Sequence, residues 1–305
     1  MRLAVLYLLT VVLAWLLGEF IGEWTVPTLL LAYVPAVVWL VPAPFVLLWT
    51  LWRRRGVGVA LVATLLAAWG AGLLHWRPHQ QGGSLRVVTF NVARGTLGGP
   101  ERVASILRAA DADVILLQET NFIPAGYRRT LLTALPGYHV GTGYEVMTLS
   151  RSPQLSNRNH AIPGSRRTVL ETAVSWRGQR LRLVNAHLNT VLVSNALKGD
   201  LNAIQRTSQA RVWQIGLLCR LASANSGPLL LGGDLNTPPR GRLSRRLHTC
   251  VGQNAHDLAG RGPGWTFPGL FLRIDHLFSR GLTPSRARVL PASGSDHRPL
   301  LVEYP

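Results

Sequence analysis

Several short apolar tracts in this chain end on polar side chains that could do chemistry. The clearest is Leu229–Arg240, in which Leu-Leu-Leu-Gly-Gly is followed by Asp234 and Asn236. The leucines predict a short strand buried on both faces, and the two glycines let the backbone turn at its end. A carboxylate and a carboxamide two residues apart could act as a base or metal ligand and as a neutral donor. Taken alone, an Asx turn that closes a loop explains the tract equally simply.

Other apolar tracts end in the same way. Their polar residues are Asn91, Glu119, His187, Asn189, Asp275, His276, Asp296 and His297. Singly, each side chain is explained by a turn cap, a loop start or a hydrogen-bonded core histidine. Together they supply carboxylate and amide oxygens beside histidines, a donor set that suits Mg²⁺ or Mn²⁺ better than zinc. The sequence has no cysteine cluster that would favour another metal.

Strands and helices mixed along residues 85–305 must position these side chains. The predicted strands are Leu85–Val92, Asp113–Glu119, Val146–Ser150, Thr168–Trp176, Arg180–Leu188, Leu229–Leu231, Ile274–Phe278, Arg286–Leu290 and Leu300–Glu303. The predicted helices are Pro100–Ala110, Arg128–Leu135 and Leu201–Ala224. This mixture of hairpins and crossovers favours two sheets packed face to face and flanked by helices.

Residues 1–78 have a different composition and are predicted to be a membrane region. Three apolar stretches, Leu3–Ile21, Pro27–Trp52 and Val57–Trp76, are each long enough to be read as a transmembrane helix. A cleaved signal peptide is the alternative for the first stretch, but it lacks a clear small-x-small cleavage site. Residues 79–84 are predicted to be a polar linker to the domain 85–305.

The loops between these stretches predict an orientation. Arg53–Arg55 is the strongest positive cluster beside an apolar stretch, while Glu19 and Glu23 lie in the other short loop. The positive-inside rule places the arginines and the N-terminus in the cytoplasm. After three crossings, the domain 85–305 would lie on the extracytoplasmic side of the cell (inner) membrane, as part of a multi-pass protein whose partner is the lipid bilayer.

Charge and cysteine content narrow the possible partners and sites further. The formal charge is +18, about fifteen of it in the domain after residue 80, and Lys198 is the only lysine. This balance favours anionic partners such as nucleic acid, phosphate esters or acidic lipid, although a biased genome composition also explains abundant arginine. Cys219 and Cys250 give neither a disulfide framework nor a metal pattern.

The order of the polar motifs resembles the endonuclease/exonuclease/phosphatase superfamily, which includes exonuclease III, deoxyribonuclease I, neutral sphingomyelinases and inositol-polyphosphate phosphatases. The motifs are Thr-Phe-Asn-Val, Leu-Gln-Glu-Thr, Asn-Ala-His-Leu, Gly-Asp-Leu-Asn, Arg-Ile-Asp-His and Ser-Asp-His-Arg-Pro, in that order from about Leu85 to the C-terminus. The resemblance implies a four-layer α/β sandwich and metal-assisted hydrolysis of phosphoesters.

The resemblance also implies roles for individual residues. Glu119 would be the main ligand of Mg²⁺ or Mn²⁺, assisted by Asn91 and Asp296. Asp234 would orient or deprotonate the attacking water, and Asn236 would hold the water or the phosphate. His297 and His187 would contact the scissile phosphate. Asp275 would fix the tautomer of His297. The presence of His187 makes the site resemble deoxyribonuclease I, sphingomyelinases and phosphatases more than abasic-site endonucleases, and His276 stands where many members have tyrosine.

Three functions remain open from the sequence. Arg240 and Arg242 follow the Asp-Leu-Asn motif and could bind the phosphates of a nucleic acid, which favours a nuclease. An equally simple reading places them on a solvated helix face. The membrane region favours a phosphodiesterase or phosphatase of lipid substrates, and the third alternative is a non-catalytic, anchored binding module. No protein partner is inferred.

Overall fold

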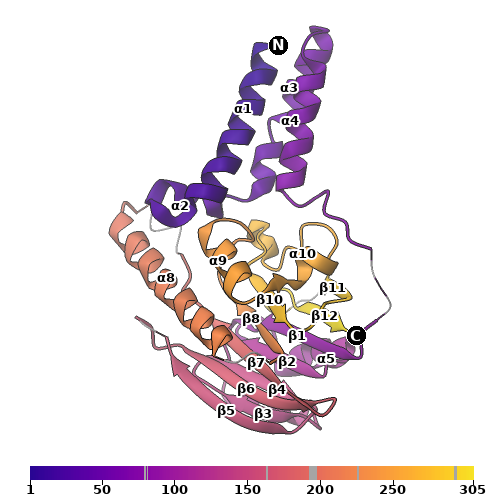
Figure 1. The fold of residues 1–305 in the computed structure, drawn as a ribbon, viewed down its shortest axis with the longest axis vertical. Helices are drawn as coiled ribbons and strands as arrows, with labels where there is room; N and C mark the ends of the chain where they lie inside the picture. The colour runs from indigo at the N-terminus through magenta and orange to yellow at the C-terminus, as the bar shows by residue number, and fades with distance from the viewer. Residues whose placement is uncertain (79, 81, 163, 192–197, 225–226, 292–293) are drawn as a thin grey trace.

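The computed structural model describes residues 1–305 except 79, 81, 163, 192–197, 225–226 and 292–293. Residues 79 and 81 of the predicted linker 79–84 therefore lie outside the described part. A bundle of N-terminal helices stands on one end of an α/β domain (Figure 1). The two parts meet beside the strand ends that carry the polar motifs.

Two six-stranded sheets form the centre of the domain. The first has the order β11-β12-β1-β2-β4-β3 and the second β5-β6-β7-β8-β10-β9. The strands of the first sheet are β1 Leu85–Asn91, β2 Val114–Gln118, β3 His139–Thr142, β4 Val146–Ser150, β11 Arg286–Val289 and β12 Leu300–Tyr304. Those of the second are β5 Gln154–Ala161, β6 Thr168–Trp176, β7 Gln179–His187, β8 Leu229–Asp234, β9 Gln253–Asn254 and β10 Asp275–Arg280.

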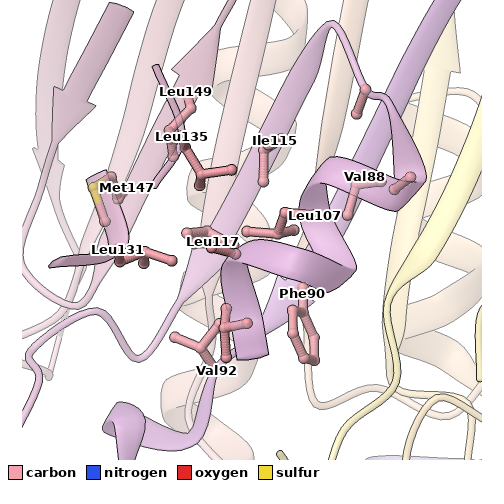
Figure 2. Packing of buried hydrophobic residues seen from close by; sticks show 14 of the residues in the cluster. Val88, Phe90, Val92, Leu107, Ile115, Leu117, Leu131, Leu135, Met147 and Leu149 are labelled. Atoms are coloured by element: carbon pink, nitrogen blue, oxygen red, sulfur yellow. The ribbon is translucent and has the colours of Figure 1, made fainter. Parts of the chain in front are cut away.

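The sheets pack face to face, and helices cover their outer faces. Val87, Leu116, Leu183 and Leu230 belong to the core between the sheets. The helices α5 (Pro100–Ala110) and α6 (Tyr127–Thr133) pack on the first sheet, where Leu107 meets Val88 and Leu117 (Figure 2). On the second sheet lie α8 (Leu201–Ser223) and α9 (Arg242–Cys250), and α10 (Ala255–Ala259) packs near the strand ends. The arrangement confirms two packed sheets flanked by helices, in four layers.

Among the described elements of the domain, three strands (β3, β5 and β9) and two helices (α9 and α10) were not predicted from the sequence. β5 is an edge strand whose side chains are mostly exposed, so its sequence lacks the apolar alternation that marks a half-buried strand. β3 is the short edge strand of the other sheet. α9 is rich in arginine and buries only one narrow stripe, including Leu243 and Leu247, against the second sheet.

The prediction of three transmembrane helices is corrected by the structure. One continuous helical segment, Arg2–Trp24, is long and apolar enough to cross a membrane; it comprises α1 (Arg2–Leu16) and the short turns η1 (Leu17–Ile21) and η2 (Gly22–Trp24). The second stretch is broken into α2 (Val26–Tyr33) and the segment Ala36–Trp52, which meet at 79°. The break occurs because Pro35 disfavours the helical conformation at Val34, which is extended. The third stretch forms α4 (Val57–Gly70), of 14 residues.

The helical bundle is built with small residues inside and large apolar residues outside. Ala4, Ala60 and Ala63 are buried between α1, α4 and α3 (Ala43–Trp52). Leu6 is 61% exposed and Phe45 70% exposed. This distribution is the reverse of that in a water-soluble bundle.

A disulfide joins the two helices on the second sheet. Cys219 of α8 is bonded to Cys250 at the end of α9. The prediction that these two cysteines form no disulfide framework was therefore wrong. Their separation of 31 residues says nothing about proximity until both helices have packed on the same sheet.

Candidate active site

Strand direction and register bring the polar motifs to one edge of the sandwich. β1 and β2 run parallel in the first sheet, and β7 and β8 run parallel in the second. In the second sheet, the register places His187 opposite Asp234 and Asp234 opposite Asp275. In the first sheet, Asn91 lies opposite Gln118, the residue before Glu119. The six predicted motifs thus converge because each ends or begins a strand at the same edge.

Asp234 is the centre of the cluster. Its Oδ2 accepts a hydrogen bond of 3.0 Å from Nδ2 of Asn91, which also donates to Oε1 of Glu119 at 3.1 Å. The Nε2 atoms of His187 and His297 lie 3.6 and 3.7 Å from the same Asp234 oxygen. Burial alone would raise the pKa of Asp234, but the positive charges of His297 and His187 hold it below its usual range. The carboxylate is therefore ionised and surrounded by donors.

His297 is held by a second buried carboxylate. Nδ1 of His297 and Oδ2 of Asp275 are 2.8 Å apart. Burial would lower the pKa of His297, but the charges of Asp275 and Asp234 outweigh burial and raise it to about 10. The structure thus brings Asp275 to the position predicted for it, with Nε2 of His297 directed toward Asp234.

Glu145 is a site residue that the sequence reading missed. Its Oε2 lies 3.4 Å from Nδ1 of His187 and 2.8 Å from Nε of Arg167. Its contact with His187 lowers the pKa of Glu145. Glu145 immediately precedes β4, which runs antiparallel to β2, so the start of β4 lies at the same edge as the end of β2. A carboxylate directly before a predicted strand was the sequence signal that could have identified Glu145.

Close backbone packing supports the loop that follows β8, residues 235–240, which we call the catalytic loop. A Cβ on Gly233 would lie 1.9 Å from the carbonyl oxygen of Ala186, so only glycine fits between the parallel strands here. Asn236 has a φ of +47° and donates from Nδ2 to the carbonyl of Leu188 at 3.1 Å. The side chain of Asn236 is thus tied to the loop after β7, beside the cluster.

His276, whose role the sequence left open, is a buried support for this loop. Its Nε2 lies 2.7 Å from the carbonyl oxygen of Thr237, and its Nδ1 lies 2.9 Å from Nδ2 of Asn254. The neutral tautomer with a proton on Nε2 satisfies both contacts. Burial accordingly lowers the pKa of His276 to about 4.

The donor set fits a hard divalent cation. One ligand atom each from Asp234, Asp275 and His297 lies within 4.8 Å of the others. Oδ1 of Asp275 is buried without a hydrogen-bond partner among the described residues. Asn91 and Glu119, two of the three predicted ligands, are in contact with each other. Asp296, the third, is exposed and bonded to the hydroxyl of its neighbour Ser295.

Arg240 and Arg242, predicted to bind substrate, contact the N-terminal segment instead of the cluster. Nη2 of Arg240 donates to the carbonyl of Val34 at 3.1 Å. The backbone N–H of Arg242 donates to Oε2 of Glu23 at 3.1 Å, and its guanidinium lies 5.0 Å from the ring centre of Trp24. Substrate binding by these arginines stays a prediction.

The chain is similar in sequence to bacterial UPF0294 proteins. The chain is 26% identical over 257 residues to a UPF0294 protein of Yersinia enterocolitica, covering 77% of this chain and 89% of that protein. A match at 28% identity to a UPF0294 protein of Vibrio campbellii spans only 40% of that protein's length.

Solved structures share the fold at lower identity. TDP2 of D. rerio in complex with a single-strand DNA product gives a TM-score of 0.57 at 19% identity, covering 72% of this chain and 98% of that one. The catalytic domain of human Nocturnin gives 0.54 at 16% identity, covering 72% and 94%. The family model described as "Endonuclease/Exonuclease/phosphatase family" matches residues 88–297. The chain belongs to the endonuclease/exonuclease/phosphatase family.

Proposed function

We propose that this protein is a membrane-anchored, divalent-cation-dependent phosphoesterase that cleaves phosphodiester bonds, with nucleic acid as the first candidate substrate. The observation that carries the proposal is the convergence on Asp234 of Asn91, His187 and His297, each histidine with a second carboxylate beside its Nδ1. Members of this family are usually hydrolases of phosphoesters. A solved structure with the same fold holds a DNA product, which supports the choice of substrate.

The residues of the cluster would divide the work of hydrolysis. Asp234, ionised and buried, is placed to orient a water molecule and take its proton. His297 is an imidazolium below a pH of about 10, so its Nε2 can donate to a phosphate oxygen as negative charge develops there. His187 would donate in the same way, because Glu145 holds its Nδ1. Asn236 would position the water or the phosphate through its side-chain amide.

Glu119, with Asn91 and Asp296, would hold Mg²⁺ or Mn²⁺. The ion would neutralise charge on the phosphate oxygens. The carboxylate and amide oxygens at this edge are hard ligands, which supports these ions over softer metals. The nearby group of Asp234, Asp275 and His297 could also hold an ion, but the hydrogen bond from His297 to Asp275 and its protonation favour the phosphate-binding role.

The anchoring part of the proposal rests on the outer face of the helical bundle. Exposed Leu6, Leu9 and Leu13 form one apolar stripe along α1, and Leu48 is exposed on α3. Apolar faces of this extent are covered in stable proteins, and a lipid bilayer would cover them. We propose that the bundle is embedded as a unit, in place of three separate full crossings.

The ends of the bundle support the predicted orientation. The N-terminus and the turn between α3 and α4 lie at the end of the bundle away from the catalytic domain (Figure 1). That turn contains Arg53–Arg55, and its Gly56 packs against Met1. The positive-inside rule then places this end in the cytoplasm and the catalytic domain outside it. The disulfide between Cys219 and Cys250 is typical of an oxidising compartment and supports the same orientation.

A lipid phosphodiesterase is the second candidate. Its support is the hydrogen bond of 2.6 Å from the hydroxyl of Tyr33, in the N-terminal segment, to the carbonyl of Asn236 in the catalytic loop. This contact ties the N-terminal segment to the catalytic loop, which supports an enzyme that acts on membrane substrates.

Hydrolysis by the purified full-length protein in lipid tests the proposal. Plasmid DNA, RNA and mixed phospholipid–sphingolipid vesicles are incubated in parallel with Mg²⁺ or Mn²⁺ and with EDTA. We expect cation-dependent cleavage of nucleic acid that falls at least about a thousandfold in Asp234→Ala and in His297→Ala, with both variants folded. Headgroup release from vesicles alone would select the lipid candidate, and full activity in either variant would refute the assigned roles.

A further inference from the structure

A cavity of about 600 Å³ lies at the junction between the helical bundle and the catalytic domain. The bundle contributes apolar walls, including Trp15, Trp69 and Leu74. The catalytic domain contributes Arg240, Trp265 and Arg273. Asp234 and the side chains gathered around it, Asn91, His187, Asp275 and His297, do not line it, so the cavity is separate from this cluster.

Two arginines, the partly buried Arg240 and the buried Arg273, make one wall of this cavity cationic. Among the described residues, no carboxylate lies within ion-pair distance of Arg240. Its guanidinium makes one hydrogen bond there, from Nη2 to the carbonyl oxygen of Val34. Arg273 is 8% exposed and pairs through Nη2 with Asp257 at 2.6 Å. Its Nε and Nη1 have no hydrogen-bond partner in the described part of the chain. Unsatisfied buried N–H groups of a guanidinium are costly, and an oxyanion would satisfy them.

The acidic residues of the lining are already engaged. Glu19 accepts from Arg245 at 2.6 Å and from the backbone N–H of Gly241 at 3.2 Å. Asp257 is bound to Arg273. Arg77, which also lines the cavity, is exposed, and in the described part of the chain its side chain bonds only the backbone carbonyl of Asp257, through Nε. The charge left for a ligand is therefore positive.

The apolar walls favour a ligand with a lipid tail over a free anion. Trp15 and Trp69 lie 5.9 Å apart between ring centres and belong to the same helices, α1 and α4, whose outer faces are apolar. Tryptophan is enriched where membrane helices meet the headgroup region. An anionic head in the cavity would leave its acyl chains free to lie along this outer surface.

We propose that this cavity binds the anionic headgroup of a membrane phospholipid, with Arg240 and Arg273 as the phosphate-binding residues. The inference rests on the proposed embedding of the bundle in a bilayer. It assigns the lipid to a site of its own and does not make it the substrate.

Lipid binding to the full-length protein in neutral detergent tests the inference. Thermal unfolding is followed with increasing phosphatidylglycerol, with phosphatidylcholine of the same acyl chains, and with inorganic phosphate. All titrations contain EDTA, so that binding is measured without hydrolysis. We expect saturable stabilisation by phosphatidylglycerol, and little by the other two.

Three variants identify the site. Arg240→Gln should raise the half-saturating phosphatidylglycerol concentration about tenfold, because a charge-assisted hydrogen bond is lost. Arg77→Gln, at an exposed position of the wall, should weaken binding in the same direction and guards against misfolding of the Arg240 variant. Arg246→Gln is the matched control, because Arg246 is exposed on α9 and does not line the cavity.

Equal stabilisation by both lipids, equal stabilisation by inorganic phosphate, or wild-type affinity in both Arg240→Gln and Arg77→Gln would overturn the inference. The hydrolysis assay is independent of this titration. Lipid binding without hydrolysis of any substrate would leave the inference intact and refute the proposed activity. Hydrolysis without selective lipid binding would support the proposed activity and refute the inference.

Discussion

At the scale of single residues, the two histidines around Asp234 are each oriented by a carboxylate. Asp275 bonds Nδ1 of His297 at 2.8 Å, and Oε2 of Glu145 lies 3.4 Å from Nδ1 of His187. Both imidazoles direct Nε2 toward the same Asp234 oxygen. A hydrogen-bonded carboxylate fixes the tautomer and the direction of an imidazole. The arrangement needs only side chains at strand ends, because the backbone register already sets their spacing.

Glu145→Gln should lower kcat about ten- to a hundredfold, because His187 loses the charge that orients it. The measurement is steady-state hydrolysis of the best substrate from the panel. Glu171→Gln is the control, since Glu171 makes a similar contact of 2.9 Å with His160 away from the site. Equal losses in the two variants would mean that Glu145 acts only through stability.

His276 should make the protein less stable in mild acid. Its pKa is lowered to about 4 by burial, against an ordinary value of 6.5. Between these values the unfolded chain binds a proton that the folded protein does not, so stability falls as pH drops from about 6.5 to about 4. Above pH 6.5 this residue makes no pH-dependent contribution.

Denaturant unfolding at pH 7.0 and 4.5, in EDTA, measures this effect. The loss of stability between the two values should shrink in His276→Gln, since glutamine does not titrate. An unchanged loss would show that other groups, such as the carboxyls with lowered pKa, account for the acid sensitivity.

At the scale of elements, the N-terminal segment is part of the support of the catalytic loop. Tyr33 of α2 bonds Asn236, and α2 packs through Leu29 and Ala32 against Ile204 of α8. Glu19 and Glu23 accept from the backbone N–H groups of Gly241 and Arg242 at the start of α9. Carboxylates at a helix N-terminus are favourable because they meet unpaired N–H groups and the positive end of the helix dipole.

Tyr33→Phe should lower kcat severalfold and stability by about 1–3 kcal/mol, because the Asn236 carbonyl loses its buried donor. Tyr7→Phe is the matched control: its hydroxyl bonds the carbonyl of Trp39 at 2.8 Å within the helical bundle. If both variants keep wild-type kcat, the N-terminal segment does not position the catalytic loop.

The disulfide should stabilise the packing of α8 with α9. Replacing Cys219 and Cys250 with serine should lower the free energy of unfolding by about 2–4 kcal/mol, because the unfolded chain regains the freedom of the closed loop. Unfolding of the oxidised protein, the reduced protein and the double variant is compared. Identical stability in all three would show that the bond contributes nothing.

At the scale of the whole molecule, the helical bundle adjoins the end of the domain that carries the site. The arginine turn at Arg53–Arg55 and the N-terminus lie at one end, and the catalytic edge faces the other end of the bundle (Figure 1). The cavity with Arg240 lies where the two parts meet. The proposed anchoring would bring both the catalytic loop and the proposed lipid site to the membrane surface.

An alkaline phosphatase fused after Pro305 should be active, whereas the same reporter inserted in the turn at Arg53–Arg55 should be inactive. Alkaline phosphatase folds only outside the cytoplasm, where its disulfides form. A fluorescent protein that folds in the cytoplasm serves as the reciprocal reporter at both positions. The reversed pattern would place the catalytic domain in the cytoplasm.

The sequence alone determined nine of the twelve described strands and the polar residues at their ends. β2 and β8 begin as apolar runs and β1 is mostly apolar, so their positions could be predicted locally, and the polar residues that end them could be named. The resemblance supplied the roles of these residues. Exposed edge strands such as β5 escaped because they bury no face that would leave a periodic pattern.

Only the tertiary structure decided which distant segments meet. Tyr33 and the Cys219–Cys250 bond carry no local signal, and Glu145 carries only that of a carboxylate before a strand, because each acts on a partner brought near by folding. Arg240 was assigned to substrate from its place beside the Asp-Leu-Asn motif, yet its side chain turns to Val34. Hydropathy counted three membrane helices, but a proline broke the second and the third was short, because hydropathy measures composition and not the continuity of a helix.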